Sequence, residues 1–206
     1  MPLIDFRYRP PTRETLDSFI CHPVYSEYMK HSSFSAQEPK TLDECVTSLK
    51  ELSVQKAVFT GRDCESNYRY PSSNDLVLRY MEAFPDVFIG FYGIDPHKKM
   101  GGVRAFCRAV KDYGMRGASM EPCMAHTAAD DALYYPFYAA CCELNVPVII
   151  TAGLSPHMPG VTLAPMHPSR IDKVAGDFPE LRILISHGGY PWIMEAVAVT
   201  QRNSHV

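Results

Sequence analysis

The sequence lacks paired cysteines, long apolar runs and any excess of basic charge. Its seven cysteines form no CxxC pair and are odd in number, which favours reduced thiols and a cytoplasmic location. The 20 Lys and Arg residues stand against 23 Asp and Glu residues without a basic cluster, so neither nucleic acid nor an anionic membrane is expected as a partner. The N-terminus has no apolar signal core, and no run approaches the roughly 18 apolar residues of a membrane span. These absences predict a cytoplasmic globular protein.

A unit made of a short apolar run, a polar loop and an amphipathic stretch recurs along the 206 residues. The apolar runs are rich in β-branched or aromatic residues and end in turn residues, as expected for strands buried on both faces. The expected strands are Leu3–Phe6, Lys56–Thr60, Val87–Ile94, Arg116–Met120, Val146–Thr151 and Arg182–Ser186. The expected helices are Leu42–Leu52, Asn74–Ala83, Val103–Tyr113, Leu133–Leu144, Ile171–Gly176 and Trp192–Gln201.

Alternating strands and helices predict an α/β protein with a parallel sheet covered by helices. Either an open doubly wound sheet or a (β/α)8 barrel of the TIM type has this pattern. The open nucleotide-binding sheet is disfavoured, because the sequence contains no GxGxxG after its first strand and no GxxxxGK[ST] motif. Polar residues at nearly every strand end favour the barrel, whose active site lies at that edge.

The side chains at the strand ends are candidates for chemistry. Arg7 and Arg9 are two residues apart, so they point to the same side of the first strand. His187 directly follows an apolar strand and precedes two glycines that allow close approach of the backbone. The other candidates are Asp63, Glu121, Thr151, His157, Tyr190 and Trp192.

Four segments resemble a known family when taken in order: Ile4-Asp5-Phe6, the run PVIITAG that ends at Gly153, His167-Pro168, and DFPELRILISHGG over residues 177–189. They are similar to the amidohydrolase-related TIM-barrel hydrolases and decarboxylases, in the branch that contains aminocarboxymuconate-semialdehyde decarboxylase. The resemblance extends from Leu3 to about Arg202.

The resemblance implies one metal ion, usually zinc, held by an HxH after the first strand, a His ending strand 5 or 6, and an Asp ending strand 8. This sequence departs from that pattern. Arg7 and Arg9 occupy the HxH positions, Thr151 occupies the strand 5 position, and His187 alone keeps the family residue. The strand 8 Asp has no visible counterpart. Because a guanidinium has no lone pair to offer a cation, we expect no metal at the family position.

Two guanidiniums at that position predict a site for anions. We expect a hydrolase of the amidohydrolase superfamily that acts on a small cyclic or aromatic carboxylate without a tightly bound metal. Arg7 and Arg9 would bind the substrate, with Thr151, His157, Tyr190 and Trp192 lining the site. His187 would serve as acid and base, because an imidazole titrates near neutral pH, and Glu121 or Asp63 would assist it.

Four alternatives stay open. The arginines could form internal ion pairs with Asp5 or Glu121 that hold the strand ends together. A zinc ion could bind elsewhere, to Glu121, His157 and His187. The reaction could be a non-oxidative decarboxylation, as in part of the family. A non-catalytic ligand-binding or assembly barrel is the alternative from another class.

The length is short for the expected barrel, which typically takes about 250 residues. Six β/α units fill residues 1–206, which we interpret as a single domain with an insertion over residues 25–39. The chain therefore looks C-terminally truncated relative to the family. Six strands alone would expose two sheet edges, so a homo-oligomer is expected.

Overall fold

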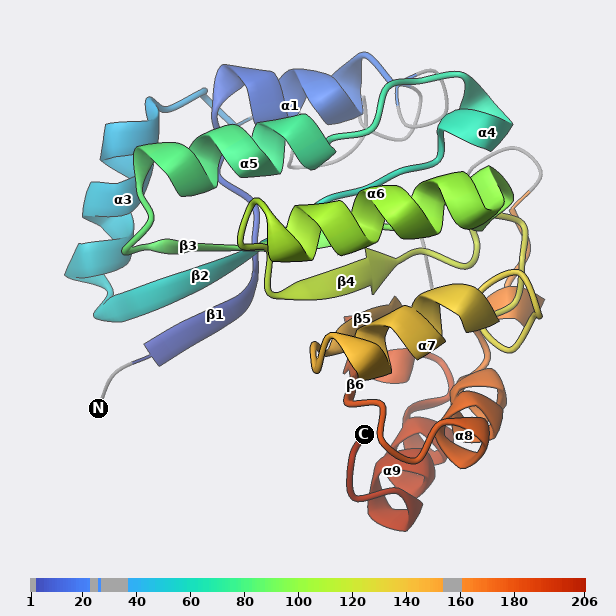
Figure 1. The fold of residues 1–206 in the computed structure, drawn as a ribbon. Helices are drawn as coiled ribbons and strands as arrows, with labels where there is room; N and C mark the ends of the chain where they lie inside the picture. Colours follow the sequence, from blue (N-terminus) through green and yellow to red (C-terminus); the bar gives the residue numbers. More distant parts are fainter. Residues whose placement is uncertain (1–2, 23–25, 27–36, 154–160) are drawn as a thin grey trace.

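All six expected strands are present in the computed structural model, which describes residues 3–22, 26, 37–153 and 161–206. The strands are β1 (Leu3–Tyr8), β2 (Val54–Thr60), β3 (Phe88–Gly93), β4 (Gly117–Met120), β5 (Val148–Thr151) and β6 (Ile183–Ser186). Each pairs in parallel with the next along the chain, and the order in the sheet is β1-β2-β3-β4-β5-β6. The sheet curls into part of a barrel with the helices outside it (Figure 1), so the predicted TIM-barrel type is confirmed.

The helices that cover the sheet are α1 (Arg13–Ile20), α3 (Leu42–Glu51), α4 (Glu65–Tyr68), α5 (Asn74–Ala83), α6 (Lys99–Lys111), α7 (Tyr135–Glu143), α8 (Pro168–Asp177) and α9 (Ile193–Arg202). The sequence predicted the start of α6 at Val103, four residues late. Gly101 and Gly102 weaken the helical signal there. At Gly102, a Cβ would lie 3.0 Å from the Phe137 ring, so the close approach of α7 accounts for that glycine.

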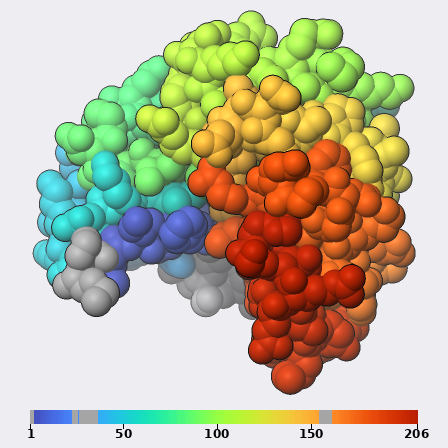
Figure 2. Space-filling model, turned by 60° about the horizontal axis from the view of Figure 1, so that its bottom comes forward, coloured from blue at the N-terminus to red at the C-terminus, as the bar shows by residue number. Residues whose placement is uncertain are grey.

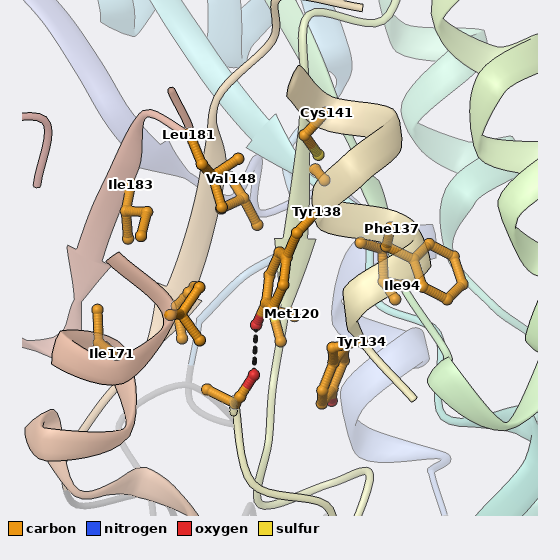
Figure 3. Packing of buried hydrophobic residues seen from close by; sticks show 14 of the residues in the cluster. Ile94, Met120, Tyr134, Phe137, Tyr138, Cys141, Val148, Ile171, Leu181 and Ile183 are labelled. Carbon is orange, nitrogen blue, oxygen red and sulfur yellow. Dashed lines mark hydrogen bonds between the residues drawn. The ribbon is translucent and has the colours of Figure 1, made fainter. Parts of the chain in front are cut away.

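Alternating side chains divide the sheet into an outer and an inner face. The outer face packs against the helices, and Figure 3 shows the larger cluster there, in which Tyr138 of α7 donates a hydrogen bond to the Ala129 carbonyl at 2.7 Å. The inner face carries a smaller apolar cluster made of Val58, Ile89, Phe91, Ile149 and Leu184. Residues two positions further along β2, β5 and β6 therefore point into the barrel as well.

The first and the last strand of the described sheet each have one neighbouring strand. Arg7 Nη1 in β1 donates a hydrogen bond to Ser186 Oγ in β6 at 2.8 Å, which joins these strands by their side chains. Figure 2 shows the first strand and the C-terminal helix on one face of the molecule. Leu3, Ile4 and Phe6 in β1 are about half exposed. The expected homo-oligomer stays a prediction.

Of the expected insertion over residues 25–39, Tyr25 and residues 27–36 lie outside the described part of the chain. The expectation of a single domain likewise stays a prediction. Within the described residues, no helix is long and apolar enough to cross a membrane.

Candidate functional site at the carboxyl ends of the strands

A cluster of charged side chains lies at the carboxyl ends of the strands, as the sequence predicted. Glu121 follows β4, and its Oε1 atom is 3.6 Å from Arg7 Nη2 and 3.5 Å from Arg9 Nη2. Tyr8 packs outward against Phe88, so the arginines on either side of it point inward. The side chains of the three charged residues are 12 to 23% exposed. The structure therefore contains the ion pair between the arginines and Glu121 that we kept open as an alternative.

A third arginine, Arg62, belongs to the same cluster. Its Nη2 atom donates a hydrogen bond to the Ser18 carbonyl of α1 at 3.1 Å. The guanidinium carbon atoms of Arg62 and Arg9 lie 4.1 and 4.6 Å from the centre of the Phe19 ring, which is within cation–π range. The sequence did not predict α1, although Thr12 caps its first turn and Leu16 and Phe19 lie on its buried side. Finding that helix would have placed Phe19 beside the arginines.

The positive charges keep Glu121 ionised. Burial alone would raise the pKa of the Glu121 carboxyl, but Arg62, Arg9, Arg7 and His187 together hold it below its ordinary value. Glu121 is therefore a carboxylate at neutral pH and a counter-charge for the arginines, and its predicted assisting role in catalysis stays a prediction.

His22, which the sequence gave no reason to select, is a buried neutral imidazole beside this cluster. Burial, and secondarily the charge of Arg62, lower the pKa of His22 to about 4, against the opposing effect of Glu121. Its ring packs against those of Tyr68 and Tyr70, with centroids 5.7 and 4.5 Å apart. His22 is therefore uncharged at neutral pH and adds no positive charge to the site.

The two hydroxyl residues that end β5 and β6 are register partners, Thr151 and Ser186. Each lies two residues beyond an inward-facing member of the inner cluster, so both point into the barrel mouth. Ser186 Oγ accepts the hydrogen bond from Arg7. Thr151 is 2% exposed, and its Oγ1 atom has no hydrogen-bond partner among the described residues.

His187 begins the turn after β6, with a φ of 69°, and its charge contributes to the low pKa of Glu121. The turn continues through Gly188 and Gly189, both with positive φ, to the exposed Tyr190. Trp192 packs on His167, with ring centroids 4.7 Å apart.

The structure thus brings His187, Glu121, Arg7 and Arg9 together, and their roles stay predictions. His157 lies outside the described residues.

Asp63 faces a different network. Its Oδ2 atom is 2.7 Å from Lys98 Nζ, which also pairs with Glu65 at 2.7 Å. Burial raises the pKa of Asp63, and the hydrogen bond and charge of Lys98 oppose that rise. Asp63 and Arg62 are adjacent in sequence but contact different partners, Lys98 and the Ser18 carbonyl. Asp63 thus pairs with Lys98, and its predicted assisting role stays a prediction.

The residues at the family's metal position do not fit a metal ion. Arg7 and Arg9, which the resemblance assigns to the HxH positions, offer no lone pair to a metal ion, and their positive charges would repel it. Their guanidiniums form ion pairs with the Glu121 carboxylate. That carboxylate is therefore already paired with positive charge. Within the described ranges, no three His, Cys, Asp or Glu side chains group closely enough to hold an ion. Of the alternative ligand set, Glu121 and His187 lie in the cluster.

A curled parallel sheet with helices outside and a polar cluster at its carboxyl edge defines a barrel of the TIM class. The chain belongs to the amidohydrolase family, whose sequence pattern matches residues 44–206. The family resemblance drawn from the strand-end motifs is therefore confirmed.

A curated relative, the 2-keto-4-carboxy-3-hexenedioate hydratase of Sphingobium sp. (strain NBRC 103272 / SYK-6), is 29% identical over 146 residues. The match covers 58% of this chain and 41% of the relative, so it includes less than half of that protein.

Two solved structures have the same fold. An uncharacterized TIM-barrel protein from Bordetella bronchiseptica is 26% identical with a TM-score of 0.75, and the match covers all of this chain and 73% of that one. The 5-carboxyvanillate decarboxylase of Novosphingobium aromaticivorans DSM 12444, complexed with manganese and 4-hydroxy-3-methoxy-5-nitrobenzoic acid, is 16% identical with a TM-score of 0.66. That match covers 98% of this chain and 68% of the decarboxylase.

Proposed function

We propose that this chain is part of an amidohydrolase-superfamily enzyme that binds a small carboxylate-bearing substrate through Arg7 and Arg9. The observation that carries the proposal is the position of the Arg7 guanidinium, which reaches from β1 to Ser186 and Glu121 at the barrel mouth. A guanidinium has five N–H donors in a fork that matches a carboxylate, so these contacts leave donors for a substrate. The carboxylate ligand of the decarboxylase with the same fold is consistent with this proposal.

The metal ion of that decarboxylase is not transferred to this chain. In our proposal the guanidiniums take the place of the metal as the positive charge that attracts the substrate. A divalent ion at Glu121, His157 and His187 is the competing hypothesis. The Coulomb repulsion between a cation and the three nearby arginines disfavours it.

We assign proton transfer to His187, because the residue directly follows β6, its charge acts on Glu121, and histidine is the side chain that most often transfers protons in enzymes. The reaction proposed is the addition of water, with His187 as the base that activates the water molecule. An arginine that binds a carboxylate stabilises its charge in the ground state, so loss of that same carboxylate as CO₂ would be slowed. A carboxylate bound to Arg7 is thus better suited to anchor the substrate than to leave as CO₂.

Water addition includes hydrolysis, which the sequence predicted, and hydration, which is the activity named for the curated relative. Decarboxylation is the second candidate, because the decarboxylase named above shares the fold. Turnover of lactones, aromatic carboxylates and unsaturated polycarboxylates in ¹⁸O-labelled water distinguishes these reactions. We expect a product that contains one oxygen atom from water, without CO₂ release. Release of CO₂ without labelled product would overturn the assignment in favour of decarboxylation, and binding without turnover would favour a non-catalytic barrel.

A further inference from the structure

Thr151 is the one predicted substrate-binding residue whose polar atom is left unsatisfied by the described part of the fold. Its Oγ1 atom is buried and without a hydrogen-bond partner among the described residues. The whole residue is 2% exposed, so bulk water does not satisfy the hydroxyl. A buried polar group without a partner costs free energy, and such groups in native proteins call for an explanation.

The direction of the side chain places the hydroxyl beside the proposed carboxylate site. Ile149, two residues before Thr151, belongs to the inner cluster of the barrel, so Thr151 points inward too. Its register partner is Ser186, which accepts the hydrogen bond from Arg7. β5 and β6 are neighbouring strands and lie about 4.8 Å apart, and Arg7 reaches Ser186 on β6. A small ligand bound to Arg7 is therefore close enough to contact Thr151 on β5.

We propose that Thr151 forms a hydrogen bond with a hydroxyl or keto oxygen on the carbon atom next to the substrate carboxylate. The substrate class is then a 2-hydroxy- or 2-oxocarboxylate, with the carboxylate on Arg7 and the neighbouring oxygen on Thr151. A threonine hydroxyl both donates and accepts, so it serves either oxygen. This inference rests on the proposed function, because it needs a carboxylate bound at Arg7.

Binding of three matched acids tests the proposal. Phenylacetate, mandelate and phenylglyoxylate share a ring and a carboxylate, and they differ in the substituent on the carbon next to the carboxylate. Titration calorimetry of the whole chain is expected to give at least about tenfold tighter binding of mandelate or phenylglyoxylate than of phenylacetate, because a site built around a hydroxyl discriminates against a ligand that lacks it. In Thr151→Val this preference should fall below about threefold, with phenylacetate affinity unchanged.

Thr127→Val is the matched control, since Thr127 is also buried but donates a hydrogen bond to the Ala125 carbonyl at 2.9 Å. It should lose thermal stability and keep the preference, whereas Thr151→Val should lose the preference and no stability. Equal binding of all three acids by the unchanged protein would overturn the inference alone, and would indicate that only water contacts Thr151. A preference that persists in Thr151→Val would also overturn it. Failure of all three acids to bind would contradict the proposed carboxylate site as well.

Discussion

Replacing Glu121 with glutamine is expected to lower the free energy of unfolding by about 3 kcal/mol. The change removes the carboxylate that Arg7 and Arg9 face at 3.6 and 3.5 Å, and it leaves their guanidiniums charged, since arginine does not deprotonate. The value is taken at the low end of the range for broken buried pairs, because about a fifth of each arginine side chain is exposed. Urea denaturation of both proteins at neutral pH measures the difference.

Glu14→Gln is the matched control for that experiment. Glu14 pairs with Arg79 at 3.0 Å, but both side chains are more than half exposed, so the loss should stay below about 1 kcal/mol. Equal effects of the two substitutions would contradict the assignment of Glu121 as the buried counter-charge.

The difference in the free energy of unfolding between the unchanged protein and Glu121→Gln is expected to shrink as the pH falls. The pKa of Glu121 is lowered in the folded protein, so its contribution is fully present above the ordinary pKa of a glutamate. As pH falls below that value toward the folded pKa, the contribution is lost, and Glu121→Gln should approach the unchanged protein in stability. Because the pKa of His22 is lowered in the folded protein, the protein also loses stability in acid as His22 is protonated in the unfolded chain. Both variants contain His22, so the difference between them cancels most of that loss.

Replacing His187 with asparagine is expected to lower kcat by about 10²- to 10⁴-fold, the usual contribution of a general acid or base. Asparagine is chosen because His187 has a φ of 69°, a conformation that asparagine tolerates better than alanine does. The substrate carboxylate contacts the arginines and not the imidazole in our proposal. KM should therefore change much less than kcat when steady-state kinetics are measured.

His126→Asn is the control for His187→Asn. His126 is also exposed and has a positive φ of 51°, but its ring contacts Tyr68 Oη at 2.8 Å, in the loop after β4. Activity within a factor of about three of the unchanged protein is expected for this variant, since surface substitutions have small effects. Comparable losses in both variants would contradict a catalytic role for His187.

The positions of the strands and of the polar cluster could be predicted because both depend on local pattern. Apolar runs such as Val148–Thr151 are buried on both faces, and parallel strands bring their carboxyl ends to one edge, so Arg7, Glu121 and His187 were placed together in advance. The contribution of α1 was not predictable in the same way. Arg62 and Phe19 meet because α1 lies against the loop after β2. This is a tertiary contact, and no periodic pattern in the sequence indicates it.

The separation of Arg62 from Asp63 shows the limit of reasoning from strand ends. Both follow β2 after Gly61 and both are more than 90% buried, yet one lies in the arginine cluster and the other binds Lys98. Which of two adjacent residues faces inward depends on the backbone beyond the last ladder pair, Thr60 with Phe91. The predicted strand Lys56–Thr60 did not determine that detail.

The central claim is that arginines replace the metal as the binding group for a substrate carboxylate. Its most direct test is titration calorimetry with phenylacetate, on protein dialysed against a chelator and on the same protein after addition of manganese. We expect equal affinity in the two states, and at least about tenfold weaker binding in Arg7→Met than in the surface control Arg79→Met. Binding that requires a stoichiometric divalent ion and is unchanged in Arg7→Met would contradict the claim.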